Sequence, residues 1–131
     1  MTGSYGDRMA TVRQFQVTFD CADPERVARF WCEILGYELH PSGVAATDPT
    51  GVGPRLYFQR VPEPKIVKNR VHLCVRVGTG LVGDERLAAL QGEQARLEPL
   101  GATHVRTMLA DDEEESCIVM QDIEGNEFCL D

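Results

Sequence analysis

The stretch FQVTFD at residues 15–20 decides how this 131-residue chain is expected to fold. Its apolar and polar side chains alternate, which predicts a half-buried strand. A similar strand, VHLCV at residues 71–75, opens a second copy of the same pattern. Each copy continues with a helix, a leucine-glycine pair and a strand. In the first copy these lie at residues 24–35, 35–36 and 56–59. In the second copy they lie at residues 84–98, 100–101 and 127–130. A unit this small cannot bury its own apolar face, so the two copies are expected to pair about a pseudo-twofold axis.

Both predicted helices have recognisable ends. In the first helix, Asp23 supplies an N-cap, Pro24 occupies the first helical position and Gly36 follows the last turn. Gly101 ends the region of the second helix in the same way. Apolar residues recur at helical spacing and are expected to face the core, namely Val27, Phe30, Trp31, Ile34 and Leu35 in the first helix and Leu87, Leu90 and Leu97 in the second.

Short strands complete each copy. They are predicted at residues 37–40 and 44–47 in the first copy, and at residues 103–108 and 117–121 in the second, where a turn at residues 124–126 leads to the closing strand. The predicted fold class is therefore α+β, with two βαβββ modules. We expect a flexible tail and then one domain, with the tail at residues 1–12, module one at 13–61, a linker at 62–70 and module two at 71–131.

Charge and hydropathy exclude several classes of protein. The formal net charge is −8, and nucleic-acid binding requires a basic face, so we expect no nucleic-acid partner. The acidic run at residues 111–115 predicts a solvated loop, and the overall field favours approach of a cationic ligand. The chain contains no long apolar run and no signal-peptide pattern, so we expect no membrane partner and a cytoplasmic location.

The five cysteines form no framework that the sequence can identify. They are an odd number and include no pair spaced by two residues, which favours reduced thiols over disulfides or a zinc finger. We expect most of them to act as small buried hydrophobes, and Cys74 and Cys129 in particular to be buried and inert because no neighbouring base is apparent.

Polar residues at matching places in the two copies are expected to meet around one shared cavity. The pairs are Gln16 with His72, and Gln59 with Cys129. Alternation along the strands brings three further side chains to the same inward faces, Thr18, Tyr57 and Cys74. Glu127 lies two residues before Cys129 and shares its face. His72 on an apolar strand also fits a core histidine whose hydrogen bonds are satisfied.

Two motifs give the chain a family resemblance. The segment FWCEILGY at residues 30–37 follows the helix start at Asp23, and DIEGN at residues 122–126 precedes the final strand. With these motifs in order, the region from 14 to 131 resembles the vicinal oxygen chelate superfamily, which includes glyoxalase I, bleomycin-resistance proteins and extradiol dioxygenases. Within it, the chain is most similar to small glyoxalase-like proteins of actinobacteria. The resemblance implies a half-open mixed sheet around a cavity, and a homodimer.

The resemblance also implies a divalent metal held by residues from both modules. The first-strand ligand positions are occupied by Gln16 and His72, and the last-strand positions, commonly glutamate, by Gln59 and Cys129. Glu127 is a substitute carboxylate. Zinc, nickel, manganese or iron are candidate metals, with zinc favoured if Cys129 ionises, and a protein without metal is an equal alternative.

Two classes of function follow. In one, the cavity binds or sequesters a small organic molecule without turnover, with Gln16, Thr18, Tyr57, Gln59 and Cys74 as ligand-binding residues. In the other, the protein is a metal-dependent lyase, isomerase or dioxygenase with His72 and Glu127 as catalytic residues.

A third alternative is dinucleotide binding. Gly78, Gly80 and Gly83 match a glycine-rich fingerprint that follows a predicted strand and precedes a helix. Only residues 109–131 remain after the next strand, which is short for a nucleotide-binding parallel sheet. A loop at the edge of the cavity is the alternative interpretation of the glycines.

Overall fold

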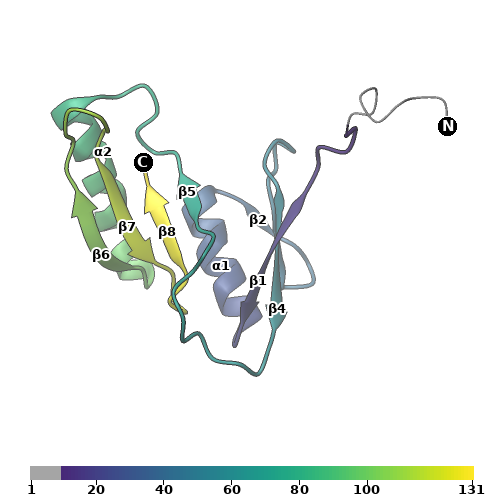
Figure 1. Ribbon diagram of the computed structural model, residues 1–131. Helices are drawn as coiled ribbons and strands as arrows, with labels where there is room; N and C mark the ends of the chain where they lie inside the picture. Colours follow the sequence, from purple (N-terminus) through teal and green to yellow (C-terminus); the bar gives the residue numbers. More distant parts are fainter. Residues whose placement is uncertain (1–9) are drawn as a thin grey trace.

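The computed structural model describes residues 10–131, which form two four-stranded mixed sheets and two α-helices (Figure 1). The strand order of the first sheet is β1 (Gln16–Cys21), β4 (Arg55–Arg60), β3 (Ala45–Thr47) and β2 (Glu38–Leu39). The second sheet repeats that order with β5 (Leu73–Val75), β8 (Glu127–Leu130), β7 (Cys117–Gln121) and β6 (Thr103–Met108). In each sheet the opening and closing strands are parallel and the other pairs are antiparallel. The predicted α+β class with two βαβββ modules is confirmed.

Helix α1 (Pro24–Leu35) begins and ends as its sequence predicts. Asp23 accepts a hydrogen bond from the backbone N–H of Arg26 at 3.4 Å, and Pro24 stands in the first turn, where no backbone donor is needed. Gly36 ends the helix in the left-handed conformation, with φ of 67°. The helix buries one face, whose members are Pro24, Val27, Ala28, Phe30, Trp31 and Ile34.

Helix α2 (Gly83–Leu97) buries Leu90 and Leu97 and covers one face of the second sheet (Figure 1). It does not run directly to Gly101 as the sequence predicted. A 3₁₀ turn, η2 (Glu98–Leu100), intervenes, and Gly101 then caps that turn with φ of 119°. Pro99 explains the change, because it has no N–H to continue the α-helical hydrogen-bond ladder.

The two modules share one hydrophobic core. Helix α1 lies between the two sheets (Figure 1). Its Trp31 ring packs edge-on against Phe128 of β8, with the ring centres 5.2 Å apart. The Trp31 ring also contacts the Phe19 ring of β1, and the two ring centres lie 5.1 Å apart. These aromatic contacts join both sheets to the same helix.

Polar contacts add a second link between the modules. The Glu124 carboxylate, in the turn before β8, accepts hydrogen bonds of 2.7 Å from the backbone N–H groups of Ala22 and Asp23. Both donors precede α1, at the end where the helix macrodipole favours a negative charge. The turn of the second module therefore fixes the start of the first module's helix.

Three sequence predictions need correction. Phe15 was expected in the first strand, but the strand begins at Gln16 and Phe15 is 67% exposed. The strand predicted at residues 71–75 was expected to begin at Val71, but β5 begins at Leu73 and Val71 is 82% exposed. The dinucleotide alternative is wrong, because β5 and β6 lie at opposite edges of their sheet, whereas that site requires adjacent parallel strands joined through the helix.

The structure also bears on the predictions for the acidic run, for a membrane partner and for the N-terminal tail. The acidic run at residues 111–115 is exposed and forms a loop between β6 and β7, as expected. None of the described helices is long and apolar enough to cross a membrane. The tail predicted at residues 1–12 lies mostly outside the described residues.

Candidate functional site

A groove separates the two modules where β1 and β5 face each other with their unpaired edges. Each of these strands pairs on one side only within the described sheets, with β4 and β8 respectively. The groove has a volume of about 320 Å³, which is within the range of small-molecule sites. We call it the inter-module groove; it is lined by Val17, Thr18, Phe19, Asp20, Lys65, Asn69, Val71, His72, Leu73, Asn126 and Glu127.

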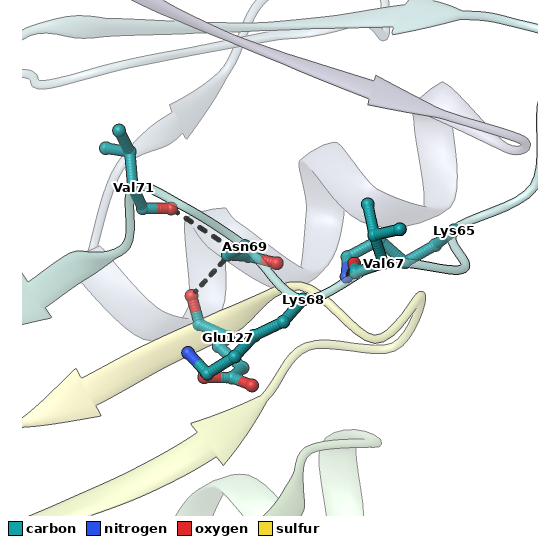
Figure 2. A network of polar contacts seen from close by, with 6 residues as sticks. All are labelled: Lys65, Val67, Lys68, Asn69, Val71 and Glu127. Atoms are coloured by element: carbon teal, nitrogen blue, oxygen red, sulfur yellow. Dashed lines mark hydrogen bonds and ion pairs between the residues drawn. The ribbon is translucent and has the colours of Figure 1, made fainter.

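Asn69, in the segment between the modules, lines the inter-module groove and has an unsatisfied acceptor. Its Nδ2 donates to the backbone carbonyls of Val71 at 3.3 Å and Glu127 at 3.4 Å (Figure 2). These two carbonyls fix the amide orientation, because a flipped amide would place oxygen against oxygen. The Oδ1 atom of Asn69 is buried and accepts no hydrogen bond.

The groove also holds charged side chains of both signs. Lys68 Nζ lies 3.1 Å from Oε1 of Glu127, and this pair ties the linker to β8 (Figure 2). Lys65 donates to the backbone carbonyl of Val67 in the same segment. Asp20 lines the wall contributed by β1. The groove thus presents two carboxylates, one of them held by a lysine that is itself largely exposed.

The polar residues predicted on β1 and β4 lie together on one face of the first sheet. Thr18 pairs with Tyr57 and Asp20 with Gln59 in the parallel register. Gln16 Oε1 accepts a hydrogen bond from Arg55 at 3.4 Å. The inter-module groove includes Thr18 but neither Gln16 nor Gln59, and both glutamines are exposed. Within one chain, these glutamines therefore do not share a cavity with His72.

A second cavity opens on the face of the second sheet opposite α2. It has a volume of about 230 Å³, and we call it the thiol pocket. Its walls hold three cysteines, a methionine and an imidazole among their lining residues, which are Lys68, His72, Cys74, Arg106, Met108, Cys117, Val119, Glu127, Cys129 and Asp131. His72 and Glu127 line both cavities.

The centre of the thiol pocket is a compact group of three ligand atoms. A ring nitrogen of His72 and the Sγ atoms of Cys74 and Cys129 all lie within 4.8 Å of one another. The parallel register of β5 and β8 produces this arrangement, because it places Cys74 directly opposite Cys129. Cys74 is exposed, in contrast to the prediction of a buried thiol, because β5 is an edge strand.

Burial and mutual repulsion keep these thiols protonated. Burial, together with the nearby Cys74, Cys117 and Asp131, raises the pKa of Cys129 to about 11. Burial and the Asp131 carboxylate raise the pKa of Cys74 as well. All five cysteines are free thiols. A thiolate here needs a compensating cation.

The donor atoms do not suit manganese, one of the candidate metals. Manganese prefers several carboxylate, carbonyl and water oxygens in octahedral arrangement, whereas His72, Cys74 and Cys129 offer one nitrogen and two sulfurs. In residues 10–131 no other group of three histidine, cysteine, aspartate or glutamate side chains has its ligand atoms so close together. Glu127, the predicted substitute carboxylate, is paired with Lys68.

Sequence reasoning found some of these residues and missed others. His72, Cys74, Cys129 and Glu127 were predicted to share one face, and the structure places all four on the thiol pocket. Asn69 was missed because it stands in a linker with no periodic pattern. Cys117 was missed because its contact with the pocket depends on how β7 and β8 pair.

Several solved structures resemble this fold. A mutant form of FosX from Listeria monocytogenes, a fosfomycin resistance protein complexed with Mn(II) and 1S,2S-dihydroxypropylphosphonic acid, is 13% identical with a TM-score of 0.67, covering 93% of this chain and 90% of that chain. An enzyme of the glyoxalase/bleomycin resistance protein/dioxygenase family from Burkholderia phytofirmans is 15% identical with a TM-score of 0.65, and the match covers 88% of this chain and 94% of that chain. FosX from Mesorhizobium loti is 15% identical with a TM-score of 0.62, and the match covers 94% of this chain and 92% of that chain. At such low identity, these similarities show the fold alone.

Sequence comparison extends this result from fold to family. No curated protein sequence gives a significant match. The family model described as a glyoxalase-like domain does match, over residues 16–130. That range begins with the first residue of β1, ends with the last residue of β8 and includes both modules. The chain therefore belongs to the glyoxalase-like domain family.

Proposed function

We propose that the protein binds a small organic molecule in the inter-module groove and sequesters it without turnover. The observation that carries the proposal is that Asn69 lines the groove and that its buried Oδ1 atom has no hydrogen-bond donor. A buried acceptor without a partner costs about 1–3 kcal/mol, and a bound ligand that donates a hydrogen bond removes that penalty.

The charges around Asn69 define the class of ligand. Asp20 and Glu127 line the same groove together with Lys65. Glu127 is paired with Lys68, whereas Asp20 has no ion-pair partner among residues 10–131, and the chain as a whole has a formal net charge of −8. An ammonium group meets both requirements, since it donates hydrogen bonds and carries a positive charge. Apolar wall residues such as Val71 and Leu73 provide contact for the hydrocarbon part of such a ligand.

Binding of simple amines tests this proposal. Benzylamine and ethanolamine, each compared with a neutral and an anionic analogue, are titrated into the protein while backbone amide chemical shifts are recorded by NMR. The cations are expected to shift resonances of Thr18, Asp20 and His72. Asn69→Leu is expected to weaken binding of benzylamine about tenfold, which corresponds to loss of one buried hydrogen bond.

The matched control for that variant is Gln16→Leu, which changes an exposed side chain on the same strand as Thr18 but outside the groove. Equal affinity of benzylamine for the wild type and for Asn69→Leu would contradict the assignment of the acceptor. Recovery of the ligand unchanged after prolonged incubation is expected for a sequestering protein.

A second candidate function is proton transfer on the bound molecule. It is favoured by the position of His72 and Glu127, which line the same groove and are the residues predicted as catalytic. Their side chains provide a base and an acid of the kind used in lyase and isomerase chemistry. Time-dependent change of the bound ligand, abolished by His72→Ala and by Glu127→Gln, would favour this function over sequestration.

A homodimer completes the proposed assembly. It is supported by the exposed polar face of the first sheet, where Gln16 and Gln59 have no cavity in common with His72 within one chain. We propose that this polar face of the first sheet forms part of the dimer interface. Sedimentation analysis should give twice the monomer mass, and Gln59→Lys should shift the equilibrium towards monomer. A chain that is monomeric at all concentrations contradicts the dimer.

We also assign the protein to a reducing cytoplasm. The support is chemical, since Cys74 and Cys129 stand opposite each other on paired strands and both are free thiols. Disulfides form and persist in oxidising compartments and are rare in the cytosol. Fractionation of cells that express the protein tests the assignment, which would fail if the protein were recovered outside the cytoplasm.

A further inference from the structure

We infer that the thiol pocket is a binding site for a zinc-type, thiophilic metal ion, held by His72, Cys74 and Cys129. This inference goes beyond the proposed ligand-binding function. It keeps His72 and Cys129 of the site that takes residues from both modules, but uses Cys74 in place of the two residues of the first module. All three ligands stand on β5, β8 or the residue just before β5, so the site is complete within the second module.

The distances fit a single small ion. Zinc binds sulfur at about 2.3 Å and nitrogen at about 2.0–2.1 Å, so two sulfurs on one tetrahedral zinc lie about 3.8 Å apart. The three ligand atoms here lie within 4.8 Å of one another, and adjustment of side-chain rotamers closes the remaining gap. The backbone does not need to move, because the strand register already sets Cys74 opposite Cys129.

The type of donor selects the class of metal. Thiolate and imidazole are the preferred ligands of zinc, whereas manganese, magnesium and calcium prefer oxygen. Further sulfur surrounds the three ligands, since Cys117 and Met108 line the same pocket. Two bound thiolates neutralise a divalent ion, which also removes the unfavourable isolated charge that a buried thiolate would carry.

Access to the site is open on one side. Cys74 is exposed, although Cys129 beneath it is only 8% exposed. An ion can therefore enter from solvent past Cys74 and be held against the buried sulfur. Three protein ligands would leave one tetrahedral position for water or a further ligand.

Cobalt substitution tests the inference. The reduced full-length protein, freed of metal with a chelator that is then removed, is titrated with Co²⁺ and then with Zn²⁺. We expect one equivalent of Co²⁺ to give sulfur-to-cobalt charge-transfer absorption in the near ultraviolet and Zn²⁺ to abolish it by displacement. Mn²⁺ at the same concentration is expected to leave the cobalt spectrum unchanged.

Substitutions identify the ligands. Cys74→Ser is expected to weaken Zn²⁺ binding at least tenfold and to remove part of the charge-transfer absorption, and because Cys74 is exposed the variant should fold normally. Cys129→Ser should have the same effect, with circular dichroism confirming its fold. The matched control is Cys32→Ser, which changes a thiol on α1 outside the pocket.

Two results would overturn the inference. One is absence of sulfur-to-cobalt absorption in the wild type, and the other is unchanged zinc affinity in the Cys74→Ser, Cys129→Ser double variant. Gln16→Leu is expected to leave zinc binding intact, since the site does not use the first module. The amine titrations described above are made without metal, so failure of one proposal leaves the other separately measurable.

Discussion

The indole Nε1 of Trp31 donates a buried hydrogen bond of 3.0 Å to Oδ2 of Asp122, and this contact crosses from the first module to the second. Trp31 is 1% exposed and Asp122 is 2% exposed. The same carboxylate also accepts from the backbone N–H groups of Glu124 and Asn126, at 2.9 Å and 3.0 Å, and from Asn126 Nδ2. One side chain thus shapes the turn before β8 and anchors it to α1.

Replacement of Asp122 is expected to destabilise the whole chain. Asp122→Ala removes the acceptor for several buried donors at once, and we expect it to lower the free energy of unfolding by about 3 kcal/mol. Urea denaturation followed by tryptophan fluorescence measures the change. Asp112→Ala, in the exposed acidic loop, is the control and should change stability by less than about 0.5 kcal/mol.

Glu124 is expected to stabilise the junction between the modules through its charge. Glu124→Gln keeps one acceptor oxygen but removes the negative charge beside the start of α1, so we expect a loss of about 1 kcal/mol in the free energy of unfolding. The loss should decrease at high salt. Glu113→Gln has the same chemistry in the exposed loop, and an equal loss in that variant would contradict the assigned role.

Two glycines are expected to respond oppositely to alanine. At Gly101 the φ angle is 119° and an added Cβ would lie 2.4 Å from Cγ2 of Ile123, so Gly101→Ala should lower the free energy of unfolding by about 1–3 kcal/mol. At Gly92, inside α2, nothing lies within 4 Å of the added Cβ, and Gly92→Ala should raise the free energy of unfolding by about 0.5–1 kcal/mol. Thermal unfolding of both variants checks these signs.

The buried thiols are expected to make the fold sensitive to alkali. The pKa values of Cys21 and Cys129 rise from 9.0 to about 11 on folding, so the folded state retains protons that the unfolded state has released. Stability from these groups is complete below pH 9 and is lost as the pH rises through about 11. We expect the wild type to lose on the order of 2 kcal/mol more over this interval than the Cys21→Ala, Cys129→Ala variant. Equal pH dependence in metal-free, reducing buffer would contradict the prediction.

The sequence predicted the secondary structure closely where hydrophobic alternation and turn chemistry agree. The bounds of β6, β7 and β8 match the prediction, and the turn between the last two strands has Gly125 with φ of 88°. The prediction for Phe15 was wrong because a strand begins where pairing with a neighbouring strand begins, and not where alternation begins. Gln16 is the first residue of β1 with a partner on β4. A single sequence shows alternation but not which residues pair.

The candidate site was less predictable than the fold. His72 and Cys129 could be identified because they occupy matching places in the repeat, and alternation brought Glu127 to the face of Cys129. The proximity of Cys74 to Cys129 depends on the register of β5 and β8, which no local pattern encodes. Asn69 acts through hydrogen bonds to two distant carbonyls, so only the folded chain reveals it.

The contact of Glu124 with Ala22 and Asp23 has a consequence for how the halves of the repeat can exist apart. The helix of the first half begins on a carboxylate from the second, and the indole of Trp31 reaches into that same turn. Peptides severed within residues 62–70 would each lack groups that the other supplies. When they are mixed, the two peptides are expected to reassemble by fragment complementation. The two halves of the sequence are similar, but neither is expected to fold fully without the other.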